Sequence, residues 1–281
     1  MTENKKYLIV NADDFGIDHG VNKAVLEGYL KGCITSASLV SVSGEEAFSE
    51  AIDIALAYPG LDVGVHIVLT SDVKNQYRAL GRAVKISRGG IFYQEPYVWA
   101  FVLQKHKHEV IEEMRMQVEK ILRRGIKPSH INSHYYSTEL PLIADALLSV
   151  AKEYGIKYVR NPREDGISLS ALADNPCKAL KALTIRFLAQ HNRRRIVKEL
   201  FNTSDFYRGV SFSGNFNAGV FMRVLKQLQP GLTELLVHPS FENSAFFSER
   251  AEFEAVIDPA VLSEIKKREI VLTNFRKGRA V

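Results

Sequence analysis

Short apolar segments alternate with segments of helical periodicity along almost the whole chain. The first unit is an apolar run at residues 7–10, followed by a helical pattern through residues 21–29 that stops at Gly32. Further strand patterns occur at residues 38–42, 63–69, 129–132, 158–160, 209–213, 234–237 and 270–274, and further helical patterns at 45–57, 107–124, 140–154, 179–200 and 218–228. Alternation of this kind predicts parallel strands joined by helical crossovers. We therefore predict an α/β fold, an irregular (β/α) barrel with a mainly parallel sheet of 7–8 strands.

Length and composition are those of an ordinary globular protein. The 281 residues are 46% apolar and 25% charged, and we expect one domain over residues 1–281. No apolar run approaches the roughly 18 residues that a membrane span needs, and the N-terminus lacks the apolar core of a signal peptide. Cys33 and Cys177 match no zinc or redox spacing. A cytoplasmic location is therefore expected.

The charge balance gives a weak indication of partners. The 37 basic and 32 acidic residues leave a net charge of +5, too little for a nucleic-acid-binding surface. The run Arg193-Arg194-Arg195 stands in the helical pattern at 179–200, near the apolar Leu183, Ile185, Phe187 and Leu188. A solvated helix face is one interpretation, and a lid or a peripheral contact with anionic lipid is the other. The sequence leaves the oligomeric state open.

Polar residues occur at the carboxyl ends of four predicted strands. Asp13 and Asp14 follow the first strand, His66 lies near the end of the third, and His134 and His238 each come directly after a later strand. In a parallel barrel the loops at these ends converge on one face, while the strand bodies form the packed core. The pattern predicts a functional site built from these five side chains.

Carboxylate and imidazole groups together suit Zn²⁺ or a similar divalent ion. A catalytic metal site uses about three protein ligands and leaves a position for water, and Asp14, His66 and His134 meet that count. The neighbouring Asp13 is the candidate general base, and His238 is the candidate general acid that protonates a leaving amine. The expected cofactor is one divalent ion, Mg²⁺ or Zn²⁺.

Each of these residues also has a structural interpretation. An Asp-Asp pair after a strand often caps a helix or forms a turn, and a single histidine is often a hydrogen-bonded core residue. We expect the remaining histidines to be structural or at the surface, with His130 as a candidate partner of a ligand.

A set of ordered motifs spans nearly the whole chain. The motifs are Asn11-Ala-Asp-Asp-Phe-Gly16, Val21-Asn22, Ile34-Thr-Ser-Ala-Ser38, Val63-Gly-Val-His66, Pro128-Ser-His-Ile-Asn-Ser-His134, Thr233-Glu-Leu-Leu-Val-His-Pro239 and Ser248-Glu-Arg250 with Glu254. As a set these motifs resemble the YdjC-type carbohydrate deacetylase family, which includes chitooligosaccharide deacetylase and a hopanoid-associated protein. The resemblance implies an irregular barrel that removes acetyl groups from N-acetylated sugars with a divalent metal. It also implies Asp14, His66 and His134 as ligands, Asp13 as base and His238 as acid.

The chain departs from this family around His134. Where the family usually has Asp-Ser-His-Gln-His-x-His, this sequence has Asn132-Ser-His-Tyr-Tyr-Ser-Thr138. The predicted ligand His134 is kept, but Asn132 replaces an acid, and Tyr136 and Thr138 replace imidazoles. The irregular segment at residues 71–97 and the pair Tyr135-Tyr136 are therefore expected to set the substrate choice.

Three functions remain compatible with the sequence. The first is a metal-dependent hydrolase that removes N-acetyl groups from an acetylated carbohydrate or glycosylated small molecule. The second is a catalytically weakened carbohydrate-binding or regulatory protein with the same fold. The third, metal-dependent phosphoester hydrolysis, has less support because no GxxxxGK[ST] phosphate-binding loop occurs.

Overall fold

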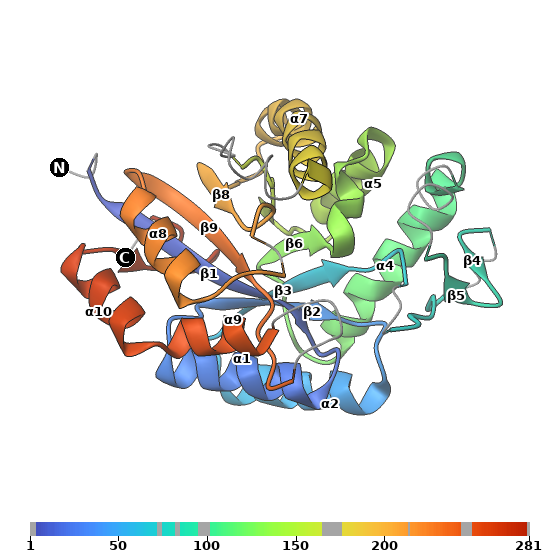
Figure 1. Ribbon diagram of the computed structural model, residues 1–281. Coiled ribbons are helices and arrows are strands. Elements are labelled where there is room, and N and C mark those ends of the chain that lie inside the picture. The colour runs from blue at the N-terminus through green and yellow to red at the C-terminus, as the bar shows by residue number, and fades with distance from the viewer. Residues whose placement is uncertain are drawn as a thin grey trace.

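A curled parallel sheet forms the centre of the molecule, as a computed structural model shows (Figure 1). The structure describes residues 4–71, 75–81, 85–94, 102–164, 176–212, 214–242 and 249–279. Its main strands are β1 (Lys6–Phe15), β2 (Ser36–Val40), β3 (Asp62–Ile67), β6 (His130–Ser133), β7 (Tyr158–Val159), β8 (Phe206–Arg208), β9 (Gly231–Val237) and β10 (Val271–Leu272). They run in the order β7-β6-β3-β2-β1-β9-β8, with β10 also paired to β1. Within the described residues the strands of this sheet pair in parallel, which confirms the predicted α/β fold with a mainly parallel sheet.

The curl nearly closes the sheet into a barrel. A single parallel bridge joins Tyr158 in β7 to Asn202, which precedes β8. The backbone of Asn202 donates to Lys157 and accepts from Val159, so the gap between the two end strands is only partly spanned. A smaller antiparallel pair, β4 (Ser87–Arg88) and β5 (Ile91–Phe92), lies in the segment that lacked periodicity in the sequence.

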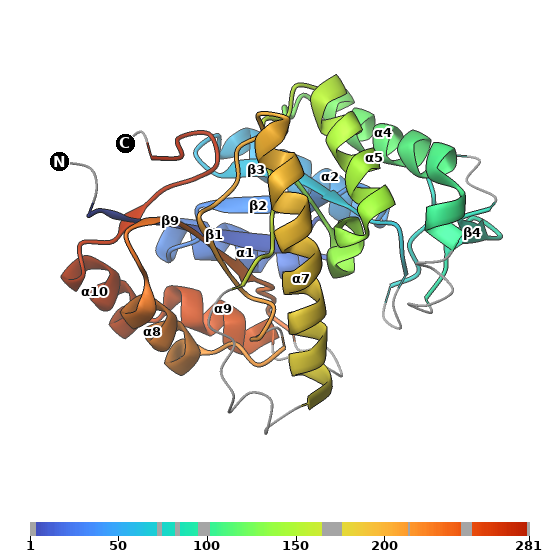
Figure 2. The same ribbon diagram turned by 90° about the horizontal axis from the view of Figure 1, so that it is seen from above.

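Helices surround the sheet (Figures 1 and 2). They are α1 (His19–Lys31), α2 (Glu45–Ala57), α4 (Lys107–Arg123), α5 (Pro141–Glu153), α7 (Pro176–Lys198), α8 (Ala218–Gln227), α9 (Glu249–Ile257) and α10 (Pro259–Lys267), together with the 3₁₀ helix η1 (His134–Glu139). In Figure 1, α1, α2 and α9 lie below the sheet, α8 and α10 at its left, α5 and α7 above it and α4 at its right. Among the residues described, no helix is long and apolar enough to cross a membrane.

Local sequence signals explain some of the helix boundaries. α1 begins after Asp18, whose carboxylate accepts from the Val21 amide, and α8 begins after Asn217, whose side chain caps Val220 in the same way. β2 and β3 are buried along their whole length, as is usual for inner strands of a parallel sheet.

Two details differ from the sequence predictions. The prediction of a strand at residues 209–213 is wrong for residues 209–212, because β8 occupies Phe206–Arg208 and the chain turns immediately afterwards; residue 213 lies outside the described residues. Gly209 has φ of +149°, and a Cβ there would lie 2.6 Å from that of Leu236, so the backbone approaches β9 too closely for another side chain. α9 and α10, in addition, were not anticipated.

The buried carboxyl group of Glu139 in η1 is hydrogen-bonded to α7. The Asn192 side chain in α7 donates to both the backbone oxygen and Oε2 of Glu139, each at 3.0 Å. Burial raises the pKa of Glu139 to about 8, although the Asn192 hydrogen bond and Arg160 act in the opposite direction.

Replacing Glu139 with glutamine is expected to make the free energy of unfolding less dependent on pH between about 5 and 8. Between the ordinary glutamate pKa and about 8, folded Glu139 holds a proton that the unfolded chain releases. Unfolding is therefore favoured as pH rises through this window. The free energy of unfolding should therefore fall less between pH 5 and pH 8 in Glu139→Gln than in the wild type. Urea unfolding of both proteins at the two pH values measures this difference. An identical pH slope in the two proteins would contradict this prediction.

Candidate active site

The five side chains predicted to form the site lie at the carboxyl ends of the strands of the sheet. β6, β3, β1 and β9 are parallel, so their carboxyl ends point the same way. β1 is longer than expected and includes both Asp13 and Asp14, while His66 is in β3. His134 opens η1 directly after β6, and His238 directly follows β9. The topology thus brings residues from four segments of the chain to this end of the sheet.

Asp14, His66 and His134 form a compact group. Asp14 Oδ1 lies 3.5 Å from His66 Nε2 and 3.3 Å from His134 Nδ1, and one ligand atom from each residue lies within 4.8 Å of the others. Both histidines are buried, and Asp14 has the left-handed backbone angle φ = +64°. A non-glycine residue in this region is uncommon and is often found at functional sites.

This group fits a divalent cation. Donor atoms of a tetrahedral site with bonds of about 2.0–2.2 Å are separated by roughly 3.3–3.6 Å, which matches both distances from Asp14. Asp14 Oδ1 is buried and accepts no hydrogen bond of good geometry in the part of the chain that is described. Burial would raise the pKa of Asp14, but the two neighbouring histidines lower it, so the carboxyl is held as an anion.

Asn132 orients one imidazole of this group. Its side-chain oxygen lies 2.7 Å from His66 Nδ1, so this nitrogen donates and Nε2 keeps its lone pair toward Asp14. The Asn132 amide donates to Ser38 Oγ at 2.7 Å and to Asp13 Oδ1 at 3.3 Å. An aspartate at position 132 could accept from His66 but could not donate to Asp13.

A buried arginine holds Asp13. Arg160, directly after β7, donates from Nη1 to Asp13 Oδ2 at 2.6 Å and from Nη2 to Oδ1 at 2.9 Å. Its Nε donates to Glu234 Oε1 in β9 at 2.6 Å, and the Asn11 amide donates to Asp13 Oδ1 at 2.8 Å. Burial alone would raise the pKa of Asp13, but Arg160 and His66 outweigh it and lower the pKa to about 2. Asp13 is therefore a fixed carboxylate at neutral pH.

His238 is paired with a buried glutamate in α9. The Glu252 carboxylate accepts from the His238 backbone amide at 2.6 Å and lies 3.9 Å from His238 Nδ1. Burial raises the pKa of Glu252 to about 7, against the opposing effect of His238. The His238 side chain is 27% exposed, so it is partly accessible to solvent.

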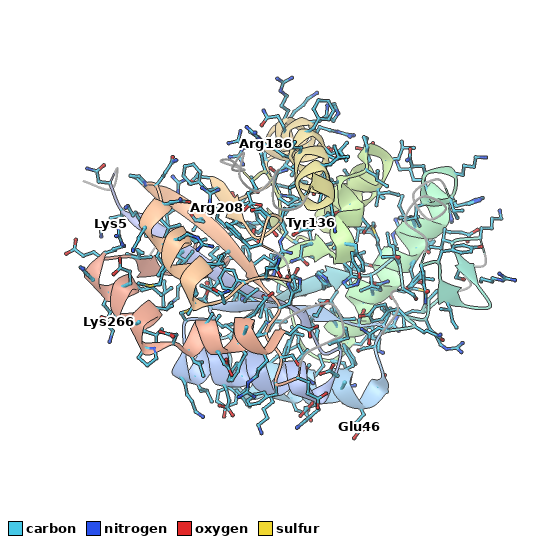
Figure 3. All side chains as sticks on the ribbon, in the orientation of Figure 1. Lys5, Glu46, Tyr136, Arg186, Arg208 and Lys266 are labelled. Atoms are coloured by element: carbon cyan, nitrogen blue, oxygen red, sulfur yellow. The ribbon has the colours of Figure 1, made fainter. Side chains whose placement is uncertain are left out.

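Aromatic rings surround His134. The rings of Tyr135 and Tyr77 lie 4.4 and 5.6 Å from it, both edge to face. Tyr135 is 44% exposed, whereas Tyr136 turns inward, with its hydroxyl 3.4 Å from that of Tyr207 (Figure 3). Tyr135 and Tyr136 have φ of +53° and +57°, two successive left-handed residues immediately after His134. Each such residue costs on the order of 1–3 kcal/mol, so the surrounding packing must hold the turn in place.

The sequence analysis missed three charged residues of the site: Arg160, Glu234 and Glu252. Only Arg160 could have been identified from the sequence. It ends the apolar strand pattern at 158–160, the same strand-end position that identified the other site residues. Glu234 lies inside a buried strand pattern, and Glu252 belongs to a helix that was not predicted. His130, in turn, reaches the site through Ser38, whose Oγ lies 2.9 Å from its Nε2.

The chain is similar to bacterial proteins named carbohydrate deacetylase. It is 23% identical to the one from Thermoanaerobacter pseudethanolicus over 96% of this chain and 98% of that protein, and 26% identical to the one from Geobacillus stearothermophilus over 97% and 98%. A match to the carbohydrate deacetylase of Brevibacillus brevis reaches 36% identity, but covers 55% of this chain and 59% of that protein.

A solved structure has the same fold. The crystal structure of a candidate cellobiose-phosphate cleavage protein from Enterococcus faecalis superposes with a TM-score of 0.78 and 22% identity, covering 97% of this chain and 98% of that one. The family model described as YdjC-like protein matches residues 7–267, a range that includes the whole site. The chain therefore belongs to the YdjC-like protein family.

Proposed function

We propose that this protein is a metal-dependent carbohydrate deacetylase that hydrolyses the N-acetyl group of an acetylated sugar. The observation that carries the proposal is the ligand group Asp14, His66 and His134 beside the arginine-held carboxylate of Asp13. Full-length similarity to proteins named carbohydrate deacetylase supports the substrate class. We propose further that residues 1–281 form one catalytic domain that acts in the cytoplasm.

The donor set favours zinc over magnesium. Two imidazole nitrogens and one carboxylate oxygen are typical of catalytic zinc sites, whereas Mg²⁺ prefers oxygen ligands in an octahedral arrangement. A divalent cation held here would supply Lewis-acid chemistry, activating water and polarising the acetamide carbonyl. The Asn132 contact with His66 Nδ1 would keep the opposite nitrogen available for this role.

The other residues of the site supply proton transfer. Asp13 is ionised and fixed, so it can accept a proton from the water that attacks the acetamide carbon. When the C–N bond breaks, the sugar amine must take up a proton, and the partly exposed His238 is the group that would deliver it. Glu252 positions His238 by accepting a hydrogen bond from its backbone amide. The products are acetate and a free amino sugar.

The direct test is release of acetate from N-acetylated chitooligosaccharides by Zn²⁺-loaded protein. We expect stoichiometric acetate and free amine, and loss of both after chelation with recovery on adding Zn²⁺ back. Saturable sugar binding without acetate release across a broad panel of substrates would contradict the proposal. It would favour the alternative, a carbohydrate-binding protein with the same fold.

Substrate choice is expected to depend on the segment at residues 71–97 and on Tyr135-Tyr136. The exposed Tyr135 ring beside His134 offers a flat surface to a sugar ring. Tyr135→Ala should raise KM about 3- to 10-fold, the equivalent of roughly 0.5–1.5 kcal/mol, with zinc content unchanged. Tyr136→His should instead change the ranking of acetylated substrates by kcat/KM. An unchanged KM for the first variant, or an unchanged ranking for the second, would remove that residue from substrate recognition.

A further inference from the structure

The outer face of α7 exposes an apolar ridge. Leu180, Leu183 and Phe187 are 65%, 39% and 75% exposed, and their spacing of three and four residues places them on one side of the helix. The opposite side is buried, with Ala182, Ile185, Ala189, Asn192 and Ile196 facing the molecule. α7 runs along the outside of the structure in both views (Figures 1 and 2). A ridge of this kind projects outward, so it can enter an apolar layer.

Positive charge is concentrated on the same helix. Seven of the 37 Lys and Arg residues lie within α7, which contains no Asp or Glu. The other 30 basic residues are outnumbered by the 32 acidic residues, so α7 accounts for the whole positive excess of the chain. Arg186 and Arg194 are exposed on α7, and Figure 3 shows Arg186 at the outer edge of the molecule.

Of the three arginines that the sequence suggested, Arg194 is exposed, whereas Arg193 and Arg195 are half-buried. Arg193 donates to the Ser204 carbonyl at 2.9 Å, and Arg195 pairs with Asp145. Ile185, one of the apolar residues that the sequence placed near these arginines, is buried. The accessible set is therefore the ridge Leu180, Leu183 and Phe187 with Arg186 and Arg194, which we call the α7 surface.

We propose that the α7 surface docks the protein on a membrane that contains anionic lipid. Basic side chains interspersed with exposed Leu and Phe on one helix fit the interface of such a bilayer, where rings and leucines enter the acyl boundary and arginines meet lipid phosphates. A partner protein would need acidic groups around an apolar groove, whereas a bilayer supplies both features over any area. This inference does not depend on the proposed activity.

Docking would place the site beside the membrane. Lys181 of α7 holds its ammonium 5.6 Å from the centre of the Tyr135 ring, and Tyr135 contacts His134. Lys181 therefore links α7, the helix that carries the α7 surface, to the rim of the candidate active site.

Sedimentation with vesicles tests the proposal. The full chain should pellet with vesicles of phosphatidylcholine containing about 30% phosphatidylglycerol, bind less at higher salt, and bind pure phosphatidylcholine at least tenfold more weakly. Leu180→Ser/Leu183→Ser/Phe187→Ser and Arg186→Gln/Arg194→Gln should each weaken binding roughly tenfold or more. Deacetylase activity toward a water-soluble substrate should stay unchanged in both variants, which separates docking from catalysis.

Two control variants carry the same types of substitution at exposed positions of other helices. Leu30→Ser/Leu56→Ser removes exposed leucines from α1 and α2, and Arg223→Gln/Lys226→Gln removes two exposed cations from α8. Both should bind vesicles like the wild type. Absence of binding at low salt would overturn the proposal, as would equal effects of test and control variants. Self-association that the Leu180/Leu183/Phe187 variant abolishes, without vesicle binding, would assign the surface to a second copy of the chain instead.

Discussion

Replacing His66 or His134 with alanine is expected to lower the affinity of the protein for Zn²⁺ by more than about 100-fold. Loss of a partner that only orients a ligand typically costs about 10–100-fold, and loss of one of three ligands should cost more. Either substitution leaves an incomplete donor set around Asp14 Oδ1. Competition with a chromophoric chelator measures the change directly, without reference to activity.

Two comparisons make this result specific. His19→Ala removes an exposed histidine that contacts Glu50 and lies outside the site, and should leave Zn²⁺ affinity unchanged. Asn132→Leu should have an intermediate effect, because it removes the hydrogen bond at His66 Nδ1 but no ligand. Wild-type affinity in both His66→Ala and His134→Ala would show that the ligands are elsewhere.

Replacing Asp13 with asparagine is expected to reduce kcat by about 10² to 10⁴-fold while Zn²⁺ stays bound. The amide cannot accept the proton of the attacking water, and the ligand group does not include residue 13. The same substitution removes one charged partner of the buried Arg160, a change that typically costs about 3–5 kcal/mol of stability. Rate and unfolding must therefore be measured on the same preparation, at a temperature where the variant is folded.

Glu234→Gln separates the two effects. It removes the other carboxylate bound by Arg160, so it should also destabilise the fold, but it leaves the Asp13 carboxylate in place. We expect its kcat to exceed that of Asp13→Asn by at least tenfold. Similar rates in the two variants would mean that Asp13 acts by holding Arg160 and not as a base.

The pH dependence of stability gives a second signature of Asp13. Its pKa of about 2 in the folded protein is below the ordinary aspartate value, so its stabilising contribution is present above pH 4 and lost as pH falls toward 2. Urea unfolding between pH 2 and 5 should show a shallower slope for Asp13→Asn. An unchanged slope would show that the carboxylate is not stabilised as the structure indicates.

The sequence by itself determined the layout of the fold. Strand and helix periods differ, so the alternation of the two predicted a parallel sheet, and α2 runs from Glu45 to Ala57 as expected. Parallel strands end on the same side, and this rule alone predicted that Asp13, Asp14, His66, His134 and His238 would lie at one edge. These features depend on patterns within a dozen residues or on a general rule of topology.

Only the tertiary structure decided which side chains meet. Arg160 is 147 residues from Asp13, and Asn132 is 66 residues from His66, so no local period links either pair. The three-residue β8 was misplaced because a strand so short has no measurable period, and its end is set by the close approach of Gly209 to Leu236. Tyr135 and Tyr136 are identical neighbours in sequence, yet one ring is exposed at the site and the other points toward Tyr207. Contacts between distant segments depend on how the curled sheet and its helices pack, and that packing is a property of the whole chain.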